Sequence, residues 1–179
     1  EQRGEQRGQQ SAAQRGAELL RAALAGPEGA PAATGSFQIR LALADAGSAT
    51  ARRLSELRNS DQAYTIAPEG DQALVLTALA DQGLYYAALT VRDLIAARAE
   101  GGVVTIPLLT VTDWPDLAER GLWGGNSAND IEWMAAHKMN LVETHVRLGV
   151  DEQGQGTASV SAEMLELARS NALKLVPIV

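Results

Sequence analysis

Residues 120–148 read RGLWGGNSANDIEWMAAHKMNLVETHVRL, and their pattern decides the fold that we expect for the second part of the chain. The pattern predicts a short strand over 120–124, a helix, and a second strand over 140–148. A helix over 161–171 and an apolar strand over 173–179 continue the same order. Strand, helix, strand, helix, strand at this spacing is typical of right-handed βαβ units in a parallel sheet.

The first of these helices shows its beginning in the sequence. Ser127 or Asn129 can cap it, and Ile131, Met134 and Ala135 then fall on one apolar face. We expect that face to pack against the parallel sheet.

The residues before Asp113 show a different order of elements. We expect a helix from Ser11 to about Gly26-Pro27, a linker over 27–35, a strand over 37–43, a short helix over 49–57, a hairpin of 63–66 and 73–77, a helix capped by Asp81, and extended segments over 103–106 and 108–112. This order predicts an antiparallel or mixed sheet backed by helices.

The domain organisation follows from these two patterns. Residues 1–10 contain no apolar side chain, so we expect a disordered lead-in there. Residues 11–113 form the expected α+β domain, and 114–179 form the start of a second domain.

Composition excludes several classes of function. The net charge of -7, with 22 acidic and 15 basic residues and no basic stripe, argues against a nucleic-acid partner. No window approaches about 18 consecutive apolar residues, so no membrane span is expected. There is no Cys, and His137 and His145 lack a metal-binding spacing, so we expect neither a metal nor another cofactor. The compartment stays open, with secretion and a periplasmic location among the alternatives.

Several segments carry a family resemblance. They are SDQAYTI over 60–66, GLYYAALTVRDL over 83–94, Ile106-Pro107, Asp113-Trp114-Pro115 and Arg120-Gly121-Leu122. In this order, over residues 13–148, they resemble the family 20 glycoside hydrolases, the β-N-acetylhexosaminidases. The resemblance implies a zincin-like α+β front domain and a TIM barrel whose first strand starts at Arg120. A (β/α)8 barrel needs eight strands and about 250 residues, so we expect the barrel in this chain to be incomplete. Because α-glucuronidases have a similar front domain, the resemblance is more specific for a glycosidase architecture than for a substrate.

Arg120 matches the family arginine that hydrogen-bonds sugar hydroxyls from the first barrel strand. The alternative is a structural ion pair with Asp116 or Glu119. Asn126 lies just past the same strand and is a further candidate for sugar contact, with helix capping as its alternative. Trp123 can stack on a sugar ring, but we favour a buried packing role.

The second barrel strand carries three more candidates for substrate binding. Glu143, His145 and Arg147 alternate with a mainly apolar set, so we expect them to point into the barrel. A hydrogen-bonded internal network is the alternative. The chain has Glu143 where the family usually has the first His of His-x-His, and Gly125 where it usually has Asp. Both differences argue against a simple transfer of the family's N-acetylhexosamine specificity to this chain.

The resemblance implies a retaining, substrate-assisted mechanism whose Asp-Glu pair ends the fourth barrel strand. Residues 173–179 form only the third strand, so we name no catalytic residue and expect this chain alone to be inactive. We expect a carbohydrate substrate, and either the rest of the barrel or an oligomer partner covering the apolar edge. The alternatives are a non-catalytic carbohydrate-binding or scaffold module, or the front part of a related glycosidase.

Overall fold

A computed structural model describes residues 11–25, 36–96, 99–100, 103–123 and 127–179. The expected lead-in over 1–10 and linker over 27–35 lie outside the described residues. The chain divides into two compact units, one of Ala12–Ala118 and one that contains Glu119–Val179.

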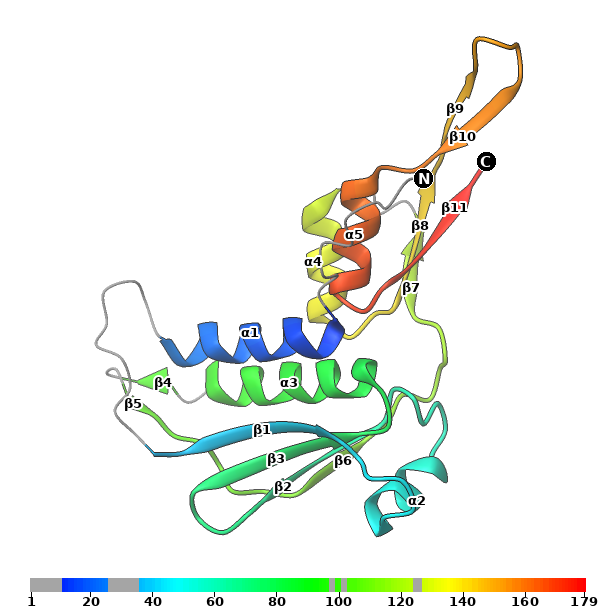
Figure 1. Cartoon of the computed structure of the whole chain (residues 1–179). Coiled ribbons are helices and arrows are strands. Elements are labelled where there is room, and N and C mark those ends of the chain that lie inside the picture. The colour runs from blue at the N-terminus through cyan, green and yellow to red at the C-terminus, as the bar shows by residue number, and fades with distance from the viewer. Residues whose placement is uncertain (1–10, 26–35, 97–98, 101–102, 124–126) are drawn as a thin grey trace, which may run out of the picture. The chain divides into compact units, whose positions relative to one another are not determined.

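The unit Ala12–Ala118 is built on a mixed four-stranded sheet (Figure 1). Its strand order is β1-β3-β2-β6, with β1 parallel to β3 and with β2 antiparallel to both β3 and β6. The strands are β1 (Gln38–Leu43), β2 (Tyr64–Pro68), β3 (Ala73–Ala78) and β6 (Val111–Asp113). The helices are α1 (Ala12–Ala25), α2 (Ala49–Ser55) and α3 (Asp81–Ala96). Two short strands, β4 (Ala99–Glu100) and β5 (Val103–Val104), pair antiparallel with each other. The expected α+β architecture is confirmed.

Helices α1 and α3 lie side by side on one face of this sheet (Figure 1). They pack closely at Gly16 because glycine has no side chain. A Cβ atom added there would lie only 3.0 Å from the Cβ atom of Ala88. Most of the apolar side chains of α3 are buried. Asp81 is the first residue of α3 rather than its N-cap, and the Leu84 N–H bonds the Ala80 carbonyl. The predicted cap is therefore one residue too late.

A buried hydrogen-bond cluster holds the end of this unit in place. The Tyr64 hydroxyl donates to Asp113 Oδ2 at 2.6 Å and lies 2.6 Å from Thr90 Oγ1. Burial, followed by the hydrogen bond to Asp113, raises the pKa of Tyr64 well above its usual value of about 10. Asn59 Nδ2 donates to the Pro115 carbonyl at 2.7 Å. The Asp-Trp-Pro segment is thus fixed by residues that precede and begin β2.

The unit that contains Glu119–Val179 is built on a parallel sheet. Its strand order is β7-β8-β11, formed by β7 (Gly121–Trp123), β8 (Leu141–His145) and β11 (Lys174–Ile178). Helices α4 (Ala128–Ala136) and α5 (Ala162–Ser170) cover one face of it (Figure 1). The parallel strands joined by helices confirm the expected βαβ units, and they are compatible with the start of a TIM barrel.

Caps and one buried amide define how this sheet begins. Ser127 caps α4 in a capping box with Asp130, which decides between the two expected caps. Asn140 is buried, and its Oδ1 accepts the Arg120 N–H at 2.8 Å while its carbonyl accepts the Lys174 N–H at 2.7 Å. Asn140 therefore joins the beginnings of all three strands.

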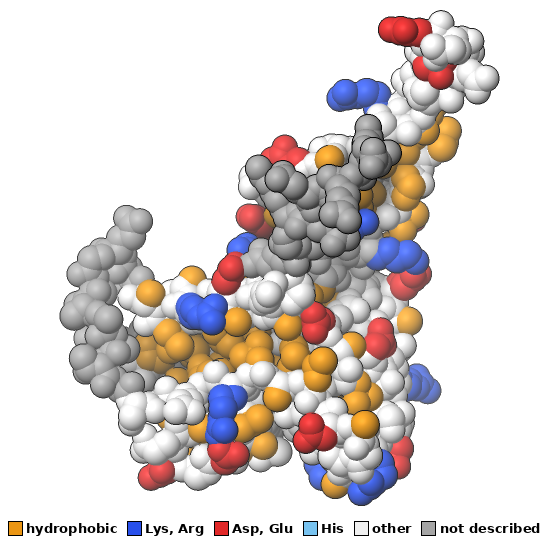
Figure 2. Space-filling model, viewed as in Figure 1, with side chains coloured by type: hydrophobic (Ala, Val, Ile, Leu, Met, Phe, Trp, Pro, Cys, Tyr) orange, Lys and Arg blue, Asp and Glu red, His pale blue; other side chains and the backbone are white. Residues whose placement is uncertain are grey.

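The expected strand over 140–148 is interrupted at Val146. Beyond it, β9 (Arg147–Val150) pairs antiparallel with β10 (Gly156–Ser159), a hairpin that the sequence pattern did not predict. Hydrophobic side chains gather along one side of this hairpin below an acidic tip (Figure 2). Leu148 and Val150 are 62% and 72% exposed.

No helix in the described part of the chain has the length and the apolar character needed to cross a membrane.

Candidate functional site

The carboxyl ends of the parallel strands in the unit Glu119–Val179 meet at one edge of the sheet. Trp123 ends β7, His145 ends β8, and Ile178, which pairs with His145, ends β11. Ligand sites of parallel α/β folds lie at this edge, because the loops that follow the strands converge there.

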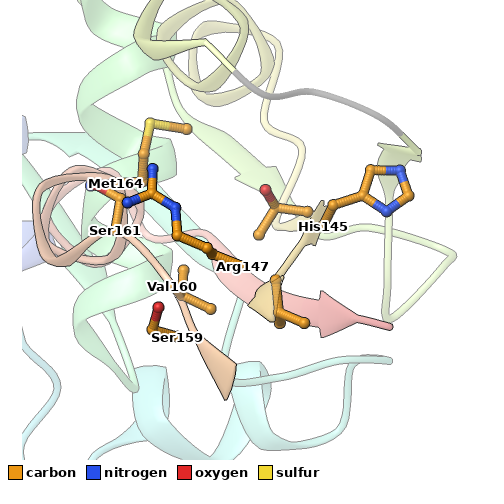
Figure 3. Close-up of a pocket in the computed structure, with 8 residues that line it drawn as sticks. His145, Arg147, Ser159, Val160, Ser161 and Met164 are labelled. Carbon is orange, nitrogen blue, oxygen red and sulfur yellow. The ribbon is translucent and has the colours of Figure 1, made fainter. Parts of the chain in front are cut away.

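A cavity of about 630 Å³ opens where β8 ends (Figure 3). It is lined by Thr144, His145, Val146, Arg147, Ser159, Val160, Ser161 and Met164. These residues come from β8, the two arms of the hairpin and the beginning of α5. The lining contains one guanidinium, one imidazole, three hydroxyl groups and no carboxylate.

Arg147 and His145 line this cavity but point to different sides. Figure 3 shows the Arg147 side chain running toward Ser161 and Met164, while His145 points away from them. The interruption at Val146 explains this difference, because alternation of side chains holds only within a continuous strand. The expected single polar face therefore does not extend from His145 to Arg147.

His145 lies beside Trp123. Their ring centroids are 6.2 Å apart with an interplanar angle of 73°, an edge-to-face arrangement. Trp123 is 72% exposed, so the expectation that it packs in a core is wrong. Together the two rings form an accessible aromatic surface, which we call the Trp123–His145 platform.

Glu143 shares the face of this platform. It pairs in register with Trp123 on one side and with Val176 on the other, and its side chain is half-buried. Val142 and Thr144, which alternate with it, are buried. The sheet thus turns Trp123, Glu143 and His145 to the face opposite its buried one.

Arg120 lies at the opposite end of the sheet, where the strands begin. Its Nε and Nη2 atoms donate to the Lys138 carbonyl at 3.1 and 2.8 Å. Glu119, one of the partners expected for it, bonds Lys174 Nζ at 3.1 Å. These hydrogen bonds give Arg120 a structural role at the end of α4, and its contact with sugar stays a prediction. Asn126 lies outside the described residues.

Metal binding finds no geometric support in the described part of the chain, where no group of three or more His, Asp or Glu side chains is placed to hold an ion. His137 Nδ1 lies 2.7 Å from the Trp133 carbonyl, and the two rings stack with centroids 4.2 Å apart on α4.

The site includes residues that sequence reasoning did not single out. Ser159, Ser161 and Met164 reach the cavity because the hairpin folds the chain back on itself. A signal for Ser161 is present, since it precedes an apolar helical pattern as an N-cap does, but that signal predicts only a helix beginning.

The fold is similar to that of several solved glycosidases. The N-acetyl-β-hexosaminidase of Streptomyces plicatus superposes with a TM-score of 0.64 at 21% identity, covering 93% of this chain and 39% of that enzyme. The β-N-acetylhexosaminidase of Streptomyces coelicolor A3(2) gives 0.63 at 21% identity, over 91% and 39% of the two chains. A GH138 enzyme targeting pectin rhamnogalacturonan II gives 0.63 at 14% identity, over 93% and 23%.

These likenesses show the fold, and the chain spans well under half the length of each enzyme. No curated protein matches the chain. The sequence profile described as glycosyl hydrolase family 20, domain 2, matches residues 3–114, which is more than half of the chain. The chain therefore belongs to glycosyl hydrolase family 20.

Proposed function

We propose that the chain is the N-terminal part of a family 20 glycoside hydrolase, in which 114–179 supply the first three strands and two helices of the catalytic TIM barrel. The all-parallel order β7-β8-β11, with α4 and α5 on one face, supports this assignment. So does the coverage of 39% of the Streptomyces plicatus enzyme by this chain. The remaining strands of the barrel would then cover the apolar edge of β11.

The Trp123–His145 platform is the observation that carries the proposal. The large aromatic ring of Trp123 is 72% exposed at the carboxyl edge of a parallel sheet, where ligands of such folds bind, and it offers a surface for stacking. The C–H groups on one face of a pyranose ring pack well on such a surface. The half-buried Glu143 can accept hydrogen bonds from sugar hydroxyls, and Asn126 is a further proposed contact.

The substrate is a glycosidic bond, with a β-N-acetylhexosaminide as the first candidate because the similar solved enzymes act in that class. We propose a retaining mechanism in which the acetamido oxygen of the substrate attacks the anomeric carbon. A Glu protonates the leaving oxygen, and a neighbouring Asp orients the acetamido group. Both acids belong to the fourth barrel strand, beyond residue 179.

The coding sequence that follows the codon for Val179 tests this proposal. A hydrolase requires an open reading frame that continues through further strand–helix units and places an Asp-Glu pair at the end of the next strand. A stop codon directly after Val179 would contradict it, and would favour a non-catalytic carbohydrate-binding or scaffold module.

A further inference from the structure

We infer that the cavity beside Arg147 binds the anionic group of a sugar residue, either a carboxylate or a sulfate ester. The inference rests on the proposed function in taking the ligand to be a saccharide. It adds a substrate class that the platform of Trp123 and His145 does not specify, because aromatic rings recognise the neutral face of a sugar.

Charge is the first argument. Within the described part of the chain, no carboxylate or carbonyl bonds the Arg147 guanidinium, and none of the eight lining residues is acidic. By contrast, Arg92 pairs with Asp93 at 2.8 Å, and Arg40 pairs with Glu69. The chemical complement of this guanidinium, in a cavity lined by no carboxylate, is an anion.

The donors around the cavity are the second argument. The Ser161 Oγ accepts the Met164 N–H at 3.3 Å, so the hydroxyl hydrogen of Ser161 remains available to donate. Arg147 and Ser161 line the same cavity (Figure 3), and Ser159 supplies another hydroxyl. A planar guanidinium pairs with two oxygens of a carboxylate or sulfate, and a hydroxyl can bond a further oxygen.

Size and apolar surface are the third argument. A volume of about 630 Å³ lies within the usual range for small-molecule sites. Val146, Val160 and Met164 line the same cavity and can contact the ring carbons of a sugar. Glu143 and Glu163 are close in sequence to lining residues but do not line the cavity. The site therefore combines cationic, hydroxyl and apolar surfaces in one open cavity.

The experiment compares acidic and neutral sugars on the full-length protein by isothermal titration calorimetry. The probes are glucuronic acid and N-acetylglucosamine 6-sulfate, with glucose and N-acetylglucosamine as their neutral counterparts. We expect at least one acidic sugar to bind about tenfold more tightly than its counterpart, and Arg147→Gln to remove that difference. Arg169→Gln is the matched control, because it removes the same charge from the last turn of α5. The sugar that binds identifies the anionic group.

Equal affinity for acidic and neutral sugars would overturn the inference, as would an equal loss of affinity in both variants. Arg147 is exposed, so its substitution should leave the circular dichroism spectrum unchanged. The proposed function fails separately: a full-length protein that binds acidic sugars through Arg147 but hydrolyses no glycoside would contradict the hydrolase assignment alone.

Discussion

The indole ring of Trp123 and the imidazole ring of His145 lie edge to face, 6.2 Å apart, at the carboxyl edge of the parallel sheet. Trp133 and His137 also lie ring to ring at α4, but in a tilted arrangement with an interplanar angle of 32° and ring centroids 4.2 Å apart. Of these two Trp–His pairs in the described part of the chain, the first lies where the strands of the parallel sheet end, and the second does not.

This difference predicts unequal effects of removing the two tryptophans. Trp123→Ala should weaken saccharide binding about tenfold, because the stacking surface is lost. Trp133→Ala is the control and should leave the affinity unchanged. Titration of both variants of the full-length protein with N-acetylglucosamine measures the effect. Equal affinities in the two variants would remove Trp123 from the site.

The contact between β7 and β8 predicts the role of the glycine in the Arg-Gly-Leu run. Gly121 pairs in register with Leu141, and a Cβ atom at Gly121 would collide with the Leu141 carbonyl oxygen. Gly121→Ala should therefore lower the free energy of unfolding by about 3 kcal/mol. Gly156→Ala adds the same methyl group where no atom lies within 4 Å, and should cost less than about 0.5 kcal/mol. Urea unfolding followed by tryptophan fluorescence separates the two, and similar midpoints would contradict the close packing.

The sequence predicted most of the elements because local patterns determine them. Alternation over 37–43 and the apolar stripe that follows Asp81 correspond to β1 and α3, and Ser127 was among the expected caps. Hydrophobic periodicity reports which face of an element is buried, and that was sufficient for the mixed sheet and for the parallel sheet.

The candidate site was harder to predict because it depends on contacts between distant residues. Residues 140–148 alternate without a break in sequence, so nothing local marks the interruption at Val146. The strand β10 exists only because it pairs with β9, and its Gly and Ser content is typical of a loop. The exposure of Trp123 likewise depends on which neighbours cover its ring.

The buried hydroxyl of Tyr64 predicts that the chain loses stability at high pH. Because the pKa of Tyr64 is raised in the folded chain, the unfolded chain releases this proton first, above about pH 10. The stabilisation is complete below that pH and decreases by up to about 1.4 kcal/mol per pH unit above it. Tyr64→Phe should reduce this slope, and at pH 7 it should cost about 1–2 kcal/mol through the lost hydrogen bonds. Urea unfolding at several pH values between 7 and about 11.5 provides the measurement. An unchanged slope in the variant would contradict the shift.

The end of α5 offers a stabilising substitution. Ala172 has a φ angle of 59°, and its N–H bonds the Arg169 carbonyl while the Leu173 N–H bonds that of Ala168. This is the helix ending at which glycine is favoured, so Ala172→Gly should raise the free energy of unfolding by about 0.5–1 kcal/mol. The same change at Ala22, which is exposed within α1, should lower it by about 1 kcal/mol. Thermal unfolding tests both, and a lower melting temperature for Ala172→Gly would refute the prediction.

The central claim is that the chain carries the beginning of a catalytic barrel whose acids lie further along the same protein. Hydrolysis of an aryl N-acetyl-β-glucosaminide tests it most directly when the 179-residue chain and the product of the complete reading frame are assayed side by side. We expect turnover by the complete product and none above buffer by the 179-residue chain. Clear turnover by the 179-residue chain, or none by the complete product on either this substrate or an aryl glucuronide, would contradict the claim.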